Sequence, residues 1–315
     1  MIDKEAIKAE LTPERFVRET NNAGNYIYEI TCNNAPNVLR EIGRLREISF
    51  RDSGGGTGKD VDLDTYDLNE ENPYKQLLVW DPEAEVIVGG YRYHVCDNNY
   101  ALNDNYKKWL ATAELFEFSN KFVHNYLPHM IELGRSFVQP SYQSTKRSAK
   151  SIFALDNLWD GLGHLITQNP GKKYFFGKVT MYPIYPADCR NMVLYFMNKH
   201  FGDNEGLVCP MYPLKTNTDE KAMSELFSAD TFKENYKILS QQIRAAGQNI
   251  PPLINSYMNL SPSMKTFGTA INGDFGSVEE TGIMITIQDL YEEKITRHIK
   301  SYINSIAADR GRENA

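Results

Sequence analysis

The chain of 315 residues contains 34 Lys and Arg against 41 Asp and Glu, a formal net charge of −7 at pH 7. Hydrophobic residues make up 41% of the chain and aromatic residues 12%, which is enough for a packed core and excludes bulk disorder. An acidic chain without a basic stripe is a poor nucleic-acid binder, and no run approaches the roughly 18 apolar residues that span a bilayer.

The first third of the chain has the patterns of a strand, a helix and a hairpin. We expect a short strand at 26–31 and then a helix over 35–50, where apolar residues recur at helical spacing and Pro36 suits the first turn. The β-rich runs 76–81 and 86–95 are joined by a short Asp-Pro-Glu-Ala-Glu turn, which predicts a hairpin.

The middle of the chain continues with a helix, a strand and a second helix. Apolar residues at helical spacing predict a helix over 115–127, and the run 130–138 is the next strand. Gly134 inside that strand indicates a bulge or a close approach of the backbone to a ligand. The second helical pattern spans 151–168, with Ser151 as its N-cap.

The remaining patterns complete a mixed set of strands and helices. Strands are expected at 173–181, 267–271 and 282–287, and helices at 186–202, 219–248, 251–260 and 290–306. This order predicts the α/β class with a mixed, partly antiparallel sheet flanked by helices; a doubly wound fold would alternate strands and helices throughout. We expect one domain over 1–315, with a helical insertion at about 184–250 and an amphipathic C-terminal helix at about 290–306.

Two loops resemble ligand-binding motifs but lack residues that those motifs need. Residues 53–60 have Ser53 and Asp60 where a phosphate-binding loop has Gly and Ser or Thr, so we interpret them as a turn. Residues 60–71 have acids at calcium-loop positions but Thr65 where the sharp turn needs Gly. There is no HExxH and no GxSxG pattern, so we expect neither a metal site nor an α/β-hydrolase.

The cysteines lie far apart, with no C-x-x-C pair and no histidine at zinc-finger spacing: Cys32, Cys96, Cys189 and Cys209. They predict reduced, mostly core-filling thiols. The charged N-terminus has no apolar stretch and therefore predicts no secretory signal. Together these features predict a cytoplasmic protein.

Charged side chains from four separate segments form the pattern that most strongly indicates chemistry. The segments 45–52, 62–67, 89–94 and 131–138 contribute Arg46, Asp64, Asp67, Arg92, Glu132 and Arg135. Such a set predicts a buried ionic network, and a solvated or merely structural set of salt bridges is the alternative. A bulge at Gly134 would aim backbone N–H groups and a carboxylate into one cleft; without it, Glu132 and Arg135 point to opposite faces.

In this order the motifs resemble a known family. They are R-x-x-x-F at Arg46 and Phe50, D-x-x-D at Asp64 and Asp67, Gly90-Tyr91-Arg92, and E-x-G-R-x-x-V at 132–138. Over about residues 26–290 the chain resembles the GNAT-superfamily N-acyltransferases of ornithine-lipid and glycine-lipid synthesis, often labelled hemolysin-like. Acyl-homoserine-lactone synthases share these motifs, but the segments 158–166, 173–181 and 251–276 favour the lipid enzymes.

The resemblance implies a GNAT fold and a thioester donor that lies along the strand 131–138. In that fold the pantetheine phosphate binds at the start of the next helix, where free N–H groups favour an anion. The loop 139–151 has no glycine but has basic residues, so we expect acyl carrier protein rather than acetyl-CoA, with no bound cofactor. The expected phosphopantetheine contacts are Lys146, Arg147, Lys150 and Ser151; an ordinary solvated loop is the alternative.

The resemblance also implies roles for the charged network. Glu132 would deprotonate the acceptor's amine, directly or through a water, with Asp64 or Asp67 as the alternative base. Backbone N–H groups beside the bulge would bind the thioester oxyanion. The substrate-binding candidates are Arg46, Phe50, Arg92 and Arg135. Arg92 or Arg135 would hold the acceptor's carboxylate, or else only brace the acids, and Phe50 and 174–176 would line an acyl tunnel or simply pack in the core.

The implied activity is N-acylation of an amino acid, glycine or ornithine, by a long, 3-hydroxylated acyl chain from acyl carrier protein. The alternatives are an acyl-homoserine-lactone synthase, which would release methylthioadenosine, a non-catalytic acyl-carrier or lipid-binding module, and an acetyltransferase. The helix expected over 290–306 either packs on the sheet or makes peripheral contact with the inner face of the cytoplasmic membrane. It contains the basic residues Lys294, Arg297, His298 and Lys300.

Overall fold

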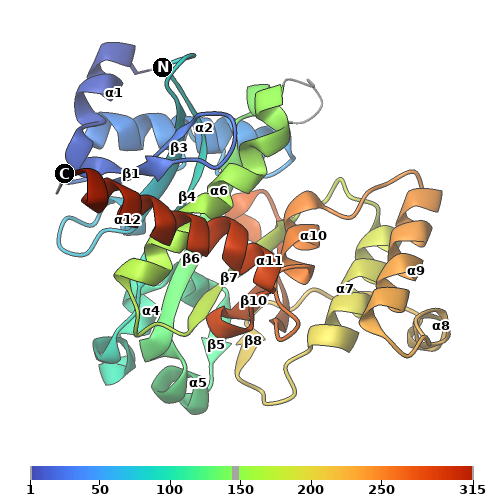
Figure 1. The fold of residues 1–315 in the computed structure, drawn as a ribbon. Coiled ribbons are helices and arrows are strands. Elements are labelled where there is room, and N and C mark those ends of the chain that lie inside the picture. The colour runs from blue at the N-terminus through green and yellow to red at the C-terminus, as the bar shows by residue number, and fades with distance from the viewer. Residues whose placement is uncertain (1, 144–148, 314–315) are drawn as a thin grey trace. The chain divides into compact units, whose positions relative to one another are not determined.

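The computed structural model describes residues 2–143 and 149–313, and for residues 103, 149–152 and 308–313 it describes the main chain alone. The chain forms two compact units (Figure 1). The first contains Met1–Cys96, His129–Lys172 and Tyr291–Ala315, and the second contains Asp97–Pro128 and Lys173–Leu290. The expected single domain over 1–315 stays a prediction.

The first unit is built on antiparallel strands in the order β1-β2-β3-β4-β6. Their bounds are β1 Phe16–Glu19, β2 Tyr26–Ile30, β3 Lys75–Asp81, β4 Val86–Val95 and β6 Met130–Val138. Strands β3 and β4 form the predicted hairpin. The predicted α/β class is confirmed.

Helices pack on both faces of these strands. They are α1 Lys4–Glu10, α2 Pro36–Asp52, α3 Thr65–Leu68, α6 Ala149–Gln168, α11 Glu292–Lys294, a π-helix Ile295–Lys300 and α12 Ser301–Glu313, with 3-10 turns at Pro13–Arg15 and Pro140–Tyr142. Helix α6 lies against the face that bears Tyr91, because a Cβ built on Gly161 would be 2.6 Å from its hydroxyl. Residues 90 and 92 alternate with Tyr91 in the pleat, so Arg92 projects to the opposite face, where Arg46 of α2 joins the same ion network.

The C-terminal segment lies across α6 (Figure 1, red on green). Its His298 and Tyr302 are both buried. Gly163 of α6 makes room for them, because a Cβ there would lie 2.4 Å from the carbonyl oxygen of His298. The apolar side of the predicted helix 290–306 therefore packs on α6, and peripheral membrane contact stays a prediction.

The second unit has antiparallel strands in the order β7-β10-β9 and a separate pair β5-β8. The strands are β5 Phe116–Phe118, β7 Tyr174–Met181, β8 Val208–Pro210, β9 Lys265–Asn272 and β10 Val278–Thr286. The helices are α4 Tyr106–Trp109, α5 Asn120–Asn125, α7 Ala187–Phe201, α8 Glu220–Leu226, α9 Phe232–Ala245 and α10 Pro252–Met258. Helices α7, α8 and α9 occupy the segment predicted as a helical insertion.

Phe176 lies in an aromatic cluster of the second unit. Its ring centroid is 5.1 Å from that of Phe122 and 5.9 Å from that of Phe267, and the residue is 2% exposed. This environment is that of core packing, one of the two fates expected for the segment 174–176.

Some predicted elements differ from the structure. The helix expected over 115–127 is wrong: the chain forms β5, then Ser119 caps the short helix α5 by accepting a hydrogen bond from the N–H of Phe122. Phe116 and Phe118 alternate with an exposed residue, so the segment follows strand periodicity at its start. The short elements α1, β1, α3, α4 and β8 were not expected from the sequence. The helix expected over 219–248 is two helices, α8 and α9, and Ser151, expected as an N-cap, lies inside α6.

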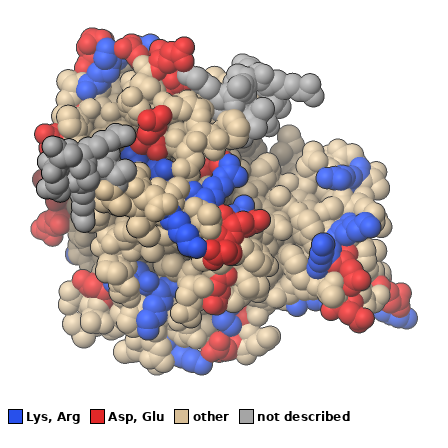
Figure 2. Space-filling model, viewed as in Figure 1, with Lys and Arg blue, Asp and Glu red and all other residues tan. Residues whose placement is uncertain are grey.

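Charged side chains are mixed on the surface. On the described part of the face drawn in Figure 2, Lys and Arg alternate with Asp and Glu, without a single basic stripe. In the described residues no helix combines the length and the apolar character that crossing a membrane requires.

Candidate active site

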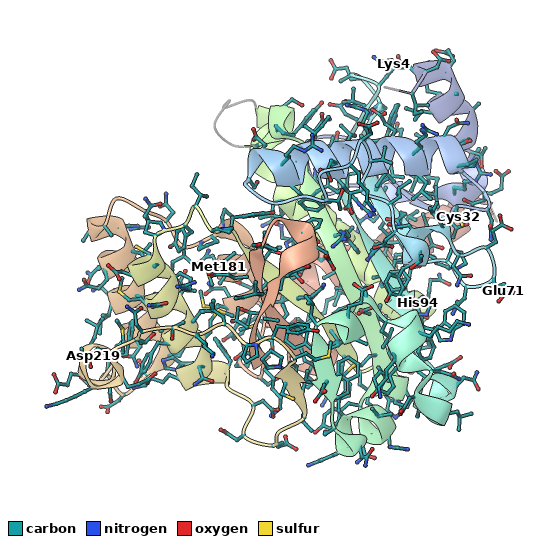
Figure 3. The ribbon with its side chains drawn as sticks, turned by 180° about the vertical axis from the view of Figure 1, so that it is seen from behind. Lys4, Cys32, Glu71, His94, Met181 and Asp219 are labelled. Carbon is teal, nitrogen blue, oxygen red and sulfur yellow. The ribbon has the colours of Figure 1, made fainter. Side chains whose placement is uncertain are left out.

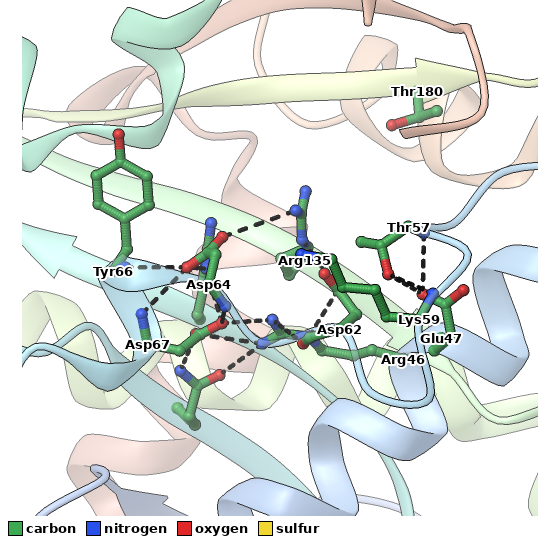
Figure 4. A network of polar contacts seen from close by, with 12 residues as sticks. Arg46, Glu47, Thr57, Lys59, Asp62, Asp64, Tyr66, Asp67, Arg135 and Thr180 are labelled. Carbon is green, nitrogen blue, oxygen red and sulfur yellow. Dashed lines mark hydrogen bonds and ion pairs between the residues drawn. The ribbon is translucent and has the colours of Figure 1, made fainter. Parts of the chain in front are cut away.

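Arg46 of α2 is the centre of a buried ion network in the first unit (Figure 4). Its Nε lies 3.1 Å from Oδ2 of Asp62, and its Nη2 lies 2.7 Å from Oδ2 of Asp67. Gln76 of β3 bridges the same groups: its Oε1 accepts from Nη1 of Arg46 at 3.3 Å, and its Nε2 donates to Oδ1 of Asp67 at 2.9 Å. A guanidinium that is 1% exposed thus has its charge balanced on two sides.

The loop that supplies the aspartates is held against α2 by a close contact. A Cβ built on Gly43 of α2 would lie 2.6 Å from Cγ of Leu63, so only glycine lets the loop approach this closely. The N–H of Asp62 donates to the carbonyl of Gly43 at 2.9 Å. The position of Asp62 is therefore fixed by its backbone as well as by its ion pairs.

Asp64 and Asp67 belong to the short helix α3 and cap it reciprocally. Oδ1 of Asp64 accepts from the N–H groups of Tyr66 and Asp67 at 3.0 and 3.1 Å, and Oδ2 of Asp67 accepts from the N–H of Asp64 at 3.3 Å. Both carboxylates also contact Nη1 of Arg92, at 2.7 Å from Asp64 and 2.9 Å from Asp67. The capping box thus fixes the carboxylates that anchor Arg92.

Strand β6 has the expected bulge, slightly later than expected. Arg92 pairs with Gly134 and Gly90 pairs with Phe137, so β6 contains one more residue than β4 between these pairs. Arg135 is the residue in the left-handed region, with φ of 53°. Its Nε lies 3.0 Å from Oδ2 of Asp62, and its Nη2 lies 3.7 Å from Oδ2 of Asp64. The bulge turns Arg135 toward the aspartate loop.

Glu132 is buried behind this network. Its Oε2 accepts a hydrogen bond from the hydroxyl of Tyr74. The Tyr74 ring stacks on His94 of β4 (labelled in Figure 3) with centroids 4.7 Å apart, and the guanidinium carbon of Arg92 lies 4.9 Å from the centroid of the same ring. Tyr74 therefore links the Glu132 carboxylate to the arginine network.

The network has a closed interior and an open edge. The side chains of Arg46, Asp62, Asp67 and Arg92 are at most 2% exposed. By contrast, 28% of the Asp64 side chain and 15% of the Arg135 side chain are exposed. A small ligand that reaches this network meets Asp64 and Arg135 first.

The electrostatics of the network favour its ionised form. Burial alone would raise the pKa of both carboxyls, but Arg92 holds the pKa of Asp64 below its ordinary value, and Arg46 with Arg92 holds the pKa of Asp67 well below its own. In return, burial would lower the pKa of Arg46 and Arg92, and the aspartates raise the pKa of both guanidiniums. The network therefore stays charged at neutral pH.

The glycine-rich loop 53–60 binds a carboxylate of its own chain. Oε2 of Glu47 accepts from the N–H and the hydroxyl of Thr57 at 2.9 and 2.7 Å (Figure 4). Oε1 accepts from the N–H of Gly58 at 2.9 Å. These contacts lower the pKa of Glu47 although burial opposes them. Two N–H groups of the loop are thus bound by Glu47, which agrees with the interpretation of this segment as a turn.

The expected site residues fall into three groups. Arg46, Asp64, Asp67, Arg92 and Arg135 form one network, with Glu132 joined to it through Tyr74. Phe50 is buried on α2. Lys146 and Arg147 lie outside the described residues, and so do the side chains of Lys150 and Ser151.

Three members of the site were not singled out from the sequence: Asp62, Tyr74 and Gln76. Asp62 lies two residues before Asp64 in the same acidic stretch, and Gln76 is a buried polar residue directly before the apolar run 77–80 of β3. Each of these could have been noticed as a polar residue in an unusual place. Tyr74 precedes its strand and had no distinguishing signal.

The site offers no metal-binding set. Among residues 2–143 and 149–313, no group of three or more His, Cys, Asp and Glu side chains is arranged to hold a metal ion. The acidic side chains of the network are instead matched by arginines. This arrangement suits recognition of charged groups by ion pairs and hydrogen bonds.

Comparison with known proteins gives a family for the chain. Residues 45–151 match the family model described as an acetyltransferase (GNAT) domain. A protein of Phocaeicola vulgatus named glycine N(alpha)-acyltransferase is 56% identical over 302 residues, which cover 96% of this chain and 92% of that protein. One of Bacteroides thetaiotaomicron with the same name is 57% identical over 304 residues, covering 96% of this chain and 90% of that protein.

The solved structures that match this chain are more distant in sequence. The acyl-homoserine-lactone synthase LasI is 14% identical with a TM-score of 0.33, and the match covers 50% of this chain and 74% of that one. The CoA-dependent synthase BjaI, solved with S-adenosylmethionine and isopentyl-CoA, is 11% identical with a TM-score of 0.38, and the match covers 90% of each chain.

Proposed function

Because this chain belongs to the GNAT acyltransferases of the glycine N(alpha)-acyltransferase family, we propose that it acylates the α-amine of glycine with a long, 3-hydroxylated acyl chain from acyl carrier protein. The observation that most strongly supports glycine as the acceptor is the identity of 56% and 57% with the two relatives, over 96% of this chain. At such identity the acceptor named for them is the first one to test here, ahead of ornithine.

The donor is proposed from the segment between β6 and α6. The sequence from 139 to 151 has no glycine, whereas acetyl-CoA enzymes of this superfamily normally supply a glycine-rich loop there. It contains Lys146, Arg147 and Lys150 instead, which suit the acidic surface of a carrier protein and its phosphopantetheine phosphate. The enzyme would then need no bound cofactor.

The chemistry removes two protons from the nitrogen and returns one proton to the sulfur. The glycine ammonium loses a proton, its nitrogen attacks the thioester carbonyl, and the C–S bond breaks to give an amide and a thiolate. The second nitrogen proton leaves as the amide forms, and the thiolate takes up one proton to become the carrier's thiol. We assign the first deprotonation to Glu132, directly or through a water, with Asp64 as the alternative because its side chain is the more exposed.

The bulge in β6 supplies a place for the thioester oxyanion. The bulge interrupts the regular ladder next to Arg135, and in this proposal backbone N–H groups beside it bind the oxyanion. The product, an acylated amino acid, is amphiphilic. We therefore place the reaction at the start of amino-acid lipid synthesis, in the cytoplasm or at the inner face of its membrane.

Mass spectrometry of the products tests the proposal. Purified protein is incubated with 3-hydroxypalmitoyl-carrier protein and a mixture of amino acids that includes glycine and ornithine, and N-(3-hydroxyacyl)glycine is the expected product. If the protein uses the matching acyl-CoA as efficiently as the acylated carrier protein, the proposal that carrier protein is the donor is wrong. Release of methylthioadenosine when S-adenosylmethionine is added would contradict the whole reaction in favour of lactone synthesis.

The role of Glu132 has its own test in the same assay. Glu132→Gln keeps the shape of the side chain and its acceptor oxygen for Tyr74, so we expect a folded protein with product formation reduced by roughly a hundredfold or more. Full activity of this variant would remove Glu132 from the mechanism.

A further inference from the structure

We propose that Asp64 and Arg135 form a binding pair for the zwitterion of a free α-amino acid, in which Asp64 binds the ammonium group and Arg135 binds the carboxylate. This inference rests on the proposed function and specifies which residues select the acceptor. It also decides between Arg92 and Arg135 as the carboxylate ligand.

The two oxygens of Asp64 have different surroundings. Oδ1 accepts from the N–H groups of Tyr66 and Asp67 and from Nη1 of Arg92. Among the described residues, the only cationic group within 4.0 Å of Oδ2 is Nη2 of Arg135, at 3.7 Å. Since 28% of the side chain is exposed, Oδ2 is the oxygen that can accept from a substrate ammonium.

Arg135 is the arginine of the network that a ligand can reach. Each of the three arginines contacts two carboxylates of the protein, but the side chains of Arg46 and Arg92 are only 1% and 2% exposed. Arg135 is more exposed, and it keeps a left-handed φ of 53°, a conformation that costs energy in any residue with a Cβ. Strain of this kind persists at functional positions when the side chain is needed there.

The spacing of the pair suits an α-amino acid. Bond lengths along N–Cα–C place the ammonium nitrogen and the nearer carboxylate oxygen of glycine about 2.7 Å apart. Oδ2 of Asp64 and Nη2 of Arg135 are 3.7 Å apart. The four charged groups can therefore alternate in sign around a compact square, each ligand charge against its opposite.

The charge balance of the network also favours a zwitterion. Three aspartates, Asp62, Asp64 and Asp67, pair with three arginines, Arg46, Arg92 and Arg135, and Glu132 joins them only through the hydroxyl of Tyr74. A ligand that is neutral overall adds no net charge to this partly buried place, whereas a simple amine or a simple carboxylate would. We therefore expect discrimination against acceptors that lack the carboxylate.

Equilibrium binding to the full-length protein at pH 7 tests the pair without requiring turnover. Calorimetry or NMR titration compares glycine with glycinamide, which retains the amine but has no carboxylate. We expect glycine to bind at least roughly tenfold more tightly than glycinamide. Arg135→Gln should weaken the binding of glycine by roughly tenfold to a hundredfold and leave the binding of glycinamide unchanged. Asp64→Asn should weaken the binding of both compounds by a similar factor.

The variants have matched controls. Asparagine is a good N-cap, so Asp64→Asn keeps the cap of α3, and Asp219→Asn makes the same change at the N-cap of α8. Arg44→Gln removes an arginine of α2 that pairs with Glu41. Both controls should bind glycine as the unchanged protein does.

Two results would overturn the pair: equal binding of glycine and glycinamide to the unchanged protein, or equal weakening of both by Arg135→Gln. An acyl-transfer assay run in parallel separates this inference from the proposed function. Selective binding of glycine without formation of acylglycine would support the binding pair and contradict the proposed acyl transfer. Acylation of glycine and glycinamide with equal efficiency would support acyl transfer and contradict the binding pair.

Discussion

Single residues of the network divide into those that support it and those that face outward. Asp67 is fully buried and accepts from Arg46, Arg92 and Gln76, so it holds two guanidiniums in place. Asp64 and Arg135 are attached to this support but remain partly exposed. A change in the interior should therefore reduce stability first, and a change at the edge should reduce function first.

Asp67→Asn tests the supporting role. The substitution leaves two buried arginines short of a negative charge, and removing one partner of such a set typically costs about 3–5 kcal/mol. We expect the free energy of unfolding, measured with urea at pH 7, to fall by that amount. The exposed pair of Asp104 and Lys107 provides the comparison, because Asp104→Asn should cost less than about 1 kcal/mol. Similar losses in both variants would contradict the supporting role.

Elements of the first unit are brought together by small residues at close contacts. Gly43 allows the aspartate loop to lie on α2, and Gly163 allows the C-terminal segment to lie on α6. At the second contact the helix is π-helical over Ile295–Lys300, and Nδ1 of His298 lies 2.7 Å from Oδ1 of the buried Asp160. The contact is thus both close-packed and polar.

Gly163→Ala tests the packing of these elements. The new methyl group would lie 2.4 Å from the carbonyl oxygen of His298 and 2.9 Å from Cβ of Tyr302, so the C-terminal segment must shift. Overpacking of this kind costs about 1–3 kcal/mol. We expect faster hydrogen exchange in residues 295–307 by mass spectrometry, with little change elsewhere.

Gly171→Ala is the control for that experiment, because a Cβ at Gly171 meets no heavy atom within 4 Å. Unchanged exchange in the Gly163→Ala variant would show that the C-terminal segment accommodates the methyl group and is not held by this contact.

Across the whole molecule, several ionised carboxylates make stability depend on pH. Burial opposes the ionisation of Glu29, but hydrogen bonds, among them those from His164 and Lys75, outweigh it and lower its pKa to about 2 from an ordinary value of 4.5. The pKa values of Asp64 and Asp67 are lowered too, against an ordinary value of 3.8. A depressed pKa stabilises the fold above the unfolded-state value, and this contribution is lost as the pH falls through the folded-state value.

We therefore expect a urea midpoint that is nearly constant above about pH 5.5 and falls steeply below about pH 4.5. Glu29→Gln should lower the free energy of unfolding by about 3 kcal/mol at pH 7, and the difference from the unchanged protein should shrink toward pH 2. A difference that stays constant from pH 7 to pH 2 would contradict an electrostatic contribution from Glu29.

Most of the elements, and the motif residues of the network other than Asp62, Tyr74 and Gln76, could be predicted from the sequence. Periodicity and turn residues located α2, the hairpin β3-β4, β6, α6, β7 and α7, because amphipathic segments must bury one face wherever they end up. The charged motifs around Arg46, Asp64, Arg92 and Glu132 were recognisable in their order along the chain. The strand–helix boundary near 115–127 was not, because a short strand followed by a capped helix has too few residues to show either period.

Which charges meet, and which of them remain accessible, could be read from the three-dimensional structure but not from the sequence. Burial is a property of neighbours from distant parts of the chain, so the sequence could not distinguish the enclosed Arg92 from the more exposed Arg135. The left-handed backbone at Arg135, one residue after the expected glycine, depends on the register of β6 against β4. For the same reason Tyr74, which links Glu132 to the network, became visible only when its strand was placed beside β4.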